Sequence, residues 1–152
     1  MNILLKLGLI MKNLPNLLDQ YTEDLIPYAD NLTITGKTLE KCLKEQATWS
    51  AYYGERNAEL GTIIKYIESQ VKKVRGQLTV RYNENYNPQL SERMTDKYID
   101  REDDYLDIYS VLLEVQELKS KYENVLDAFN RRGFALRDIT QARINEINQV
   151  TL

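Results

Sequence analysis

Basic side chains concentrate in two stretches of this sequence, and they are the residues whose types and spacing suit a chemical role. Residues 61–82 carry five basic residues against one acidic residue, Glu68; the five are Lys65, Lys72, Lys73, Arg75 and Arg81. Residues 119–143 carry six basic residues against three acidic ones and include the adjacent pair Arg131 and Arg132. Ammonium and guanidinium groups bind phosphates, and aromatic rings such as those of Tyr66, Tyr82 and Tyr86 stack on bases. Both stretches are therefore candidate surfaces for single-stranded nucleic acid.

The acidic residues between these stretches offer a second explanation. Residues 83–107 carry eight acidic residues against three basic ones. If the chain folds back on itself, Lys72 comes close to Asp100 and Lys65 close to Asp107, which would pair much of the first basic stretch internally. Exposed ion pairs contribute only about 0–1 kcal/mol, so a polyphosphate could displace such carboxylates. Nucleic-acid binding and internal pairing both stay open at this point.

Residues suited to catalysis or metal binding are few. The chain has no histidine and a single cysteine, Cys42, which excludes an intramolecular disulfide and a zinc site of several thiolates. Asp100, Asp104 and Asp107 share one helical face, where a solvated charged surface is favoured over a cation site. The TGKT run at residues 35–38 lacks the first glycine of a phosphate-binding loop and is typical of a helix N-terminus capped by Thr35 or Thr38. We expect no enzyme, no cofactor and no metal.

Two long helices are predicted to position the basic residues. Apolar residues recur at intervals of three and four from Leu39 to Leu78 and again from Ile108 to Phe129, which predicts long amphipathic helices. The turn-forming run at residues 82–91 lies between them, with Ser91 as N-cap of a second helix that continues to Arg132. We expect an antiparallel hairpin over residues 38–132, in which paired positions have numbers that sum to about 172.

Shorter segments flank this hairpin, within a single all-α domain over residues 14–152. A first helix is expected over Leu14–Ile26, ended by Pro27, and Gly133 is expected to end the second long helix with a left-handed backbone. A short helix over residues 134–148 would then associate with other copies, because a two-helix seam buries too little for a stable monomer. Its apolar residues are Phe134, Leu136, Ile139, Ile144 and Ile147.

The first residues of the chain leave two interpretations open. Residues 1–13 are either an extension before a start at Met11 or a short helix that packs on a partner. The apolar run is too short to cross a bilayer, which takes about 20 residues, and it lacks the features of a secretory signal. Together with the single cysteine, this predicts an intracellular protein without a membrane anchor.

Three quoted stretches resemble one known family. LDAFNRRGFALRDITQAR at residues 126–143 is similar to a segment of the UvsY-type recombination mediators of T-even-like bacteriophages. YIESQVKKVRGQLTVRY at residues 66–82 and MKNLPNLLDQYTEDLI at residues 11–26 resemble the basic segment and the start of that family. The family's Lys-x-Arg pair for DNA binding falls here at Gly76 and Leu78, so the pair itself is missing and its basic neighbours would have to replace it.

The resemblance implies a small all-helical protein without enzymatic activity that forms ring-like homo-oligomers of six or seven subunits in the host cytoplasm. It further implies binding to single-stranded DNA and loading of a RecA-like recombinase onto strands covered by single-strand-binding protein. A second class of function stays open, namely a phage structural or assembly protein that uses the hairpin only for oligomerisation. Net acidity favours the second class, and the basic stretches favour the first.

Overall fold

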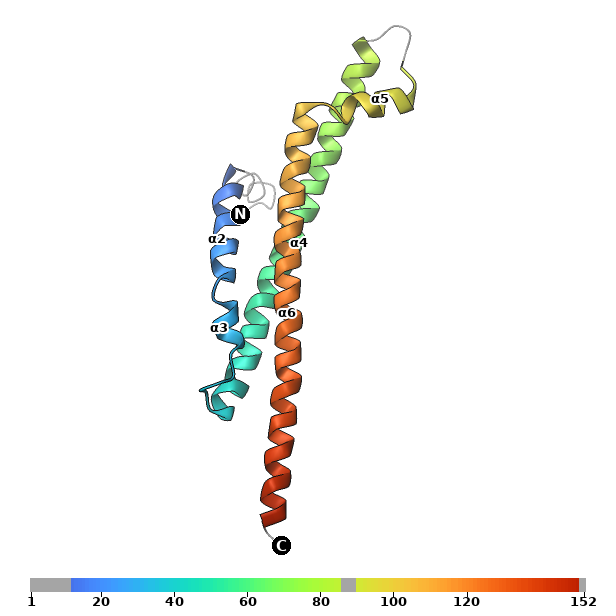
Figure 1. Cartoon of the computed structure of the whole chain (residues 1–152). Helices are drawn as coiled ribbons and strands as arrows, with labels where there is room; N and C mark the ends of the chain where they lie inside the picture. The colour runs from blue at the N-terminus through green and yellow to red at the C-terminus, as the bar shows by residue number, and fades with distance from the viewer. Residues whose placement is uncertain (1–11, 86–89, 151–152) are drawn as a thin grey trace.

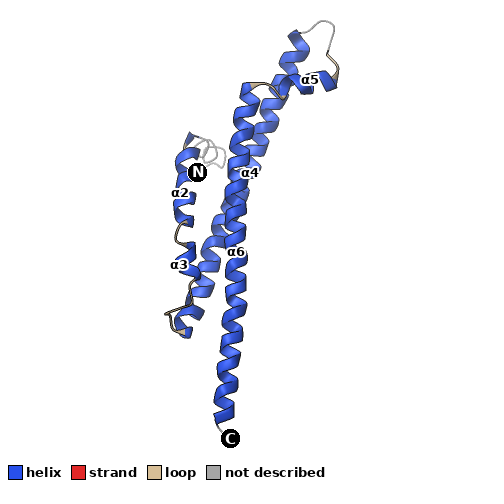
Figure 2. Cartoon of the chain, viewed as in Figure 1, coloured by secondary structure: helices blue, strands red, loops and turns tan. Residues whose placement is uncertain are grey.

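Helices make up nearly all of the chain that the structure describes. The computed structural model describes residues 12–85 and 90–150, with side chains up to residue 147. Its elements are α2 (Leu14–Leu25), α3 (Tyr28–Leu32), α4 (Leu39–Asn85), α5 (Glu92–Ile99) and α6 (Asp103–Val150), with no strand in these ranges (Figure 2). The predicted all-α class is confirmed. Residues 1–11, on which the interpretation of the N-terminal extension depends, lie outside the described ranges.

The two long helices α4 and α6 lie antiparallel along most of their length (Figure 1). α4 is continuous through the apolar stripe that predicted it, and the stripe provides its buried residues, among them Tyr53, Leu60 and Ile67. From α6, Val115, Tyr122 and Phe129 complete the seam with no exposed surface. The predicted antiparallel hairpin is confirmed.

The register of the hairpin differs from the predicted one. A side chain placed on Gly54 would contact Leu126 at 3.9 Å, and one on Gly61 would contact Lys119 at 3.5 Å, so facing positions have numbers that sum to about 180. The predicted sum of 172 was wrong by about two helical turns. The reason is the return path, because α5 and the turn at residues 100–102 interrupt what was expected to be one helix from Ser91 (Figure 1).

The predicted break at Gly133 is also wrong. α6 passes through this residue to Val150, and Gly36 is the one glycine with positive φ among the described residues, at 78°. A Cβ on Gly133 would lie 3.1 Å from Nε2 of Gln46, whose amide donates a hydrogen bond to the Phe129 carbonyl at 2.6 Å. Gly133 therefore leaves room for a side chain of α4, and residues 134–148 do not form a separate helix.

The segment α2–α3 forms a third layer over the half of the hairpin that contains the start of α4 (Figure 1). Leu14 and Tyr21 of α2 are buried, and the hydroxyl of Tyr122 donates a hydrogen bond to the Tyr21 carbonyl at 2.6 Å. α2 ends at Leu25, and Pro27 precedes α3 as its N-cap residue, which confirms the predicted end of the first helix to within one residue.

The capping residues of two helices were predicted correctly. Thr38 Oγ1 accepts a hydrogen bond from the Lys41 amide at 3.2 Å, and Ser91 Oγ accepts one from the Met94 amide at 3.4 Å. The TGKT run therefore leads into α4 as its N-terminus. Within the described ranges, no helix is both long enough and apolar enough to cross a membrane.

Candidate nucleic-acid interface

Three lysines of α4 form an exposed basic surface, which we call the lysine surface: Lys65, Lys72 and Lys73. All three are exposed, and none makes an ion pair with a carboxylate of the described residues. Lys65 and Lys72 are seven residues apart, which places them on one face of the helix about 10 Å from each other along its axis. Apolar residues of α4 point toward α6, so the lysine surface lies away from the seam and is open to a ligand.

Arg75 lies on the same helix but is paired. Its guanidinium contacts Asp96 at 2.8 Å and Asp100 at 3.3 Å, both at the end of the hairpin where α5 lies. The ring of Tyr105 lies 5.5 Å from the guanidinium carbon. Hydrogen bonding to Asp96, and then to Asp100, raises the pKa of Arg75 and outweighs the lowering by partial burial. Arg75 carries its charge at any physiological pH, but two carboxylates already use it.

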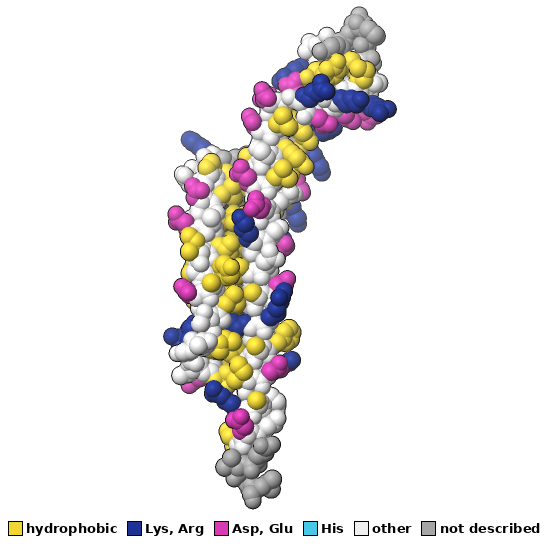
Figure 3. Space-filling model, in the orientation of Figure 1, with side chains coloured by type: hydrophobic (Ala, Val, Ile, Leu, Met, Phe, Trp, Pro, Cys, Tyr) yellow, Lys and Arg dark blue, Asp and Glu magenta, His cyan; other side chains and the backbone are white. Residues whose placement is uncertain are grey.

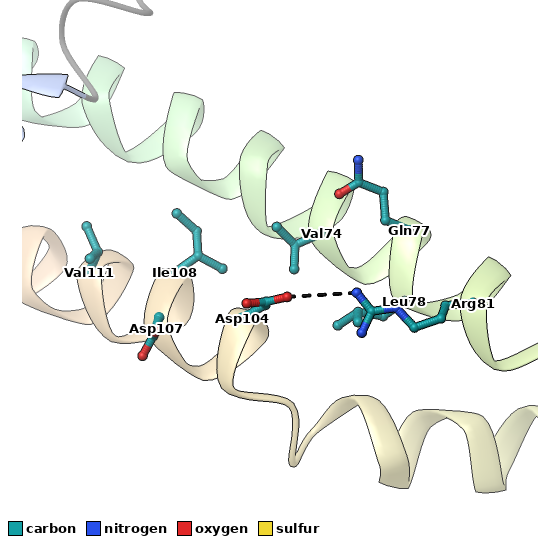
Figure 4. Close-up of a pocket in the computed structure, with 8 residues that line it drawn as sticks. All are labelled: Val74, Gln77, Leu78, Arg81, Asp104, Asp107, Ile108 and Val111. Carbon is teal, nitrogen blue, oxygen red and sulfur yellow. Dashed lines mark ion pairs between the residues drawn. The ribbon is translucent and has the colours of Figure 1, made fainter.

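Arg81 lies in a groove of about 440 Å³ between α4 and α6 (Figure 4). Its guanidinium is 3.9 Å from Asp104 and 4.0 Å from Glu102, distances that permit attraction but no strong hydrogen bond. Apolar side chains of both helices also line the groove; they are Val74, Leu78, Ile108 and Val111. Arg81 is 55% exposed in its side chain, so a phosphate could reach it.

The expected partners of the acidic residues were wrong. Asp100 pairs with Arg75 rather than with Lys72, and Asp104 pairs with Arg81. The carboxylates of α5 and of the start of α6 contact the arginines of α4, and Lys65 and Lys72 make no ion pair with the described residues. Among the described residues, no three carboxylate or thiol side chains converge as metal ligands.

A cleft of about 610 Å³ separates α4 from α5 beside the lysine surface. α4 contributes Lys72, Arg75 and Thr79 to its lining, and α5 contributes Glu92, Thr95 and Asp96. Figure 3 shows basic and acidic side chains interspersed at this end of the molecule. The cleft thus combines an unpaired lysine with an arginine whose partners are exposed carboxylates.

The adjacent arginines at the other end of α6 have different environments. Arg131 is exposed and makes no ion pair with the described residues, whereas Arg132 is 5% exposed. Nε of Arg132 donates to the Leu32 carbonyl at 3.0 Å, and Nη1 donates to the Cys42 carbonyl at 3.2 Å. Nη1 also donates to Oε1 of Gln46 at 2.7 Å. Arg132 joins three helices and is inaccessible to DNA, so its prediction as a DNA contact was wrong.

The tyrosines expected to stack on bases have mixed positions. Tyr82 stacks on Tyr98 with ring centroids 5.5 Å apart, and its hydroxyl donates a hydrogen bond to Glu102. Its ring therefore contributes to the contact between α4 and α5. Tyr66 is half-buried, and Tyr86 lies outside the described residues.

The predicted association residues are exposed with one exception. Phe134, Ile139, Ile144 and Ile147 have between 37% and 68% of their surface exposed. Leu136 is 1% exposed because the chain itself buries it, so Leu136 is unavailable to a second copy. The end of α6 extends beyond the start of α4 (Figure 1), and the last apolar residues of α6 are partly exposed. We call residues 139–147 the overhang.

Sequence reasoning missed a polar cluster between α2 and α4. Arg56 contacts Asp24 at 3.0 Å and lies over the rings of Tyr21 and Tyr52, at 5.2 Å and 5.5 Å. Burial, followed by a hydrogen bond to Glu59, raises the pKa of Tyr21 to about 12. The only sequence signal was the interruption of the apolar stripe near Arg56, which did not reveal its partners. This cluster holds α2 against the hairpin.

Comparisons with known protein families, with curated proteins and with solved structures gave no significant match. The candidate interface is therefore defined by its own geometry: unpaired lysines on α4, a cleft beside α5, and two arginines held by exposed carboxylates.

Proposed function

We propose that this protein is a non-enzymatic recombination mediator that binds single-stranded DNA and loads a RecA-like recombinase onto strands covered by single-strand-binding protein. The observation that carries the DNA-binding part is the lysine surface, which is exposed and makes no ion pair with the described residues. The resemblance of residues 126–143 and 66–82 to UvsY-type mediators supports the assignment to recombination.

Charge is the main source of affinity in this proposal. Each phosphate that a lysine or arginine neutralises releases condensed counterions, so the affinity falls with salt at a slope near −0.7 per phosphate on single strands. Exposed Lys65, Lys72 and Lys73 make these contacts first, and Arg131 adds a further exposed charge on α6. Recognition through phosphates is independent of base sequence, which suits a protein that acts on any exposed strand.

Self-association belongs to the proposal because a single hairpin offers few phosphate contacts. The overhang presents Ile139 and Ile144 with 37% and 46% of their surface exposed, which suits burial against another copy. A ring of six or seven subunits, as the resemblance implies, would repeat the lysine surface around one assembly. Repetition raises overall affinity through effective concentration without any new kind of contact.

The decisive experiment is a salt-dependent titration of a fluorescent oligothymidine with the full chain. The triple variant K65A/K72A/K73A should bind more weakly, and the slope of log affinity against log salt should become shallower by about 0.7 for each phosphate that is no longer neutralised. The control K41A/K44A/K121A removes the same net charge at three other exposed lysines, each of which pairs with a glutamate of its own helix. Equal weakening by both variants would show that net charge alone governs binding and would reject the lysine surface.

The mediator step needs its own measurement. On a strand saturated with single-strand-binding protein, a RecA-like recombinase should begin to hydrolyse ATP only after a lag. Addition of the wild-type chain should shorten this lag. If the chain binds DNA but leaves the lag unchanged, DNA binding stands and the mediator role fails.

A structural or assembly protein of a phage is the second candidate function. The exposed apolar residues of the overhang and the net charge of −3 favour it, because neither feature requires a nucleic acid. An oligomer that shows no affinity for oligothymidine at low salt would support this candidate over the mediator.

A further inference from the structure

Two carboxylates bind the Arg75 guanidinium in the way that two oxygens of a single phosphate group could bind it. Nη2 of Arg75 donates to Asp96 at 2.8 Å, and Nη1 donates to Asp100 at 3.3 Å. The two aspartates are four residues apart, and together they present two oxygens to the two ends of one guanidinium. A phosphate offers the same pair of acceptors from a single group.

These two ion pairs are not what fixes α5 in place. Thr95 and Ile99 of α5 are buried, with 4% and 0% of their surface exposed, and Tyr98 of α5 stacks on Tyr82 of α4. Ser91 also caps the first turn of α5. Because burial and stacking hold the helix, the carboxylates can exchange their partner without unfolding it.

Because these side chains are exposed to solvent, replacing the carboxylates on Arg75 by a phosphate costs little free energy. The side chains of Asp96 and Asp100 are 49% and 58% exposed, and that of Arg75 is 36% exposed. Exposed pairs of this kind are weakly held, whereas a phosphate on a polymer also gains from counterion release. Lys72 lines the same cleft as Arg75 and Asp96, so a strand in the cleft meets both basic side chains.

We propose that the cleft between α4 and α5 binds a phosphate of the strand through Lys72 and Arg75, and that Asp96 and Asp100 compete with this phosphate for Arg75. The inference rests on the proposed DNA-binding function. It adds to that function a binding site, the cleft, and two competing groups, the carboxylates of Asp96 and Asp100. The competing carboxylates lower the affinity for DNA. A polyanion can still displace them because its binding also releases counterions.

The test compares D96N/D100N with wild type in the oligothymidine titration. Removing the competitor should raise affinity about two- to fivefold for each released pair, and should steepen the salt slope as Arg75 gains a phosphate. The matched control D19N/D127N changes the same net charge at exposed aspartates that make no ion pair with the described residues. Circular dichroism of each variant checks that helix content is unchanged.

Substitution of Arg75 provides the second measurement. R75A should weaken binding in both backgrounds, and by a larger factor in D96N/D100N, where no carboxylate competes with the phosphate for Arg75. That dependence on background would support competition at Arg75 itself.

Two outcomes separate the inference from the proposed function. If wild type binds oligothymidine and D96N/D100N gains no more than D19N/D127N, the competition is refuted while DNA binding stands. If wild type and all variants fail to bind at low salt, the DNA-binding function fails and the inference fails with it.

Discussion

Replacement of Arg132 by methionine should test how the three layers of the fold are joined. Methionine keeps most of the aliphatic volume of the arginine but removes every hydrogen-bond donor of its side chain. The guanidinium now serves the Leu32 carbonyl at the end of α3 and the Gln46 side chain on α4, with bonds of 3.0 Å and 2.7 Å. Both acceptors would lose this donor at once.

The expected cost follows from burial. The Arg132 side chain is 3% exposed, so water cannot replace the missing donors, and each unsatisfied acceptor costs about 1–3 kcal/mol. The Cys42 carbonyl, 3.2 Å from Nη1, lies within α4 and keeps its helical bond, so it adds less. Glu45, whose side chain is 25% exposed and 3.8 Å from Nη2, regains solvent and also contacts Lys37. We therefore expect R132M to lose about 3 kcal/mol of a total near 5–15 kcal/mol.

Urea unfolding followed by far-ultraviolet circular dichroism measures this difference. All samples need the same protomer concentration, because association with other copies raises apparent stability. The control is R131M at the neighbouring exposed position, where a change within about 0.5 kcal/mol is expected. Equal unfolding midpoints for R132M and R131M would refute the structural role of Arg132 and restore it as a candidate for binding.

Three further predictions use the same preparations. Gly76→Ala should stabilise the chain by about 1 kcal/mol, since a Cβ there meets nothing within 4 Å. Gly133→Ala should not stabilise it, because its Cβ would lie 3.1 Å from a glutamine of α4 that is held by two hydrogen bonds. The urea midpoints of unfolding of the two variants test both expectations. I139S/I144S should lower the sedimentation mass without changing helix content, and an unchanged mass would exclude the overhang from association. The pKa of Tyr21 is raised from 10.0 to about 12, so the stability held by the neutral phenol should be complete below pH 10 and fall as pH rises to 12; Y21F should show a smaller loss over that window.

Helix positions and helix starts were determined by local sequence. The apolar stripe from Leu39 to Leu78 has a period that only a helix satisfies, and Thr38 and Ser91 cap the helices that follow them through contacts three residues away. Each of these signals involves residues that lie within one or two helical turns of each other. They do not depend on what packs against the helix.

Register and burial were decided by the tertiary structure. The pairing of α4 with α6 depends on how much chain the return path contains, and with α5 in that path Gly54 and Gly61 face residues about two turns away from the predicted ones. The position of α5 brings Asp96 and Asp100 to Arg75, and Asp104 at the start of α6 lies near Arg81, so the lysine surface makes no ion pair with the described residues.

The structure around Gly133 was likewise decided by tertiary contacts and not by local sequence. Arginines followed by glycine are typical of a helix end, and locally nothing distinguishes the buried Arg132 from the exposed Arg131. Only the approach of Gln46 and of the Leu32 carbonyl from other helices makes glycine necessary at one position and a buried guanidinium favourable at the next. Contacts between residues far apart in sequence supply more free energy here than the local preference for a break, so α6 continues to Val150.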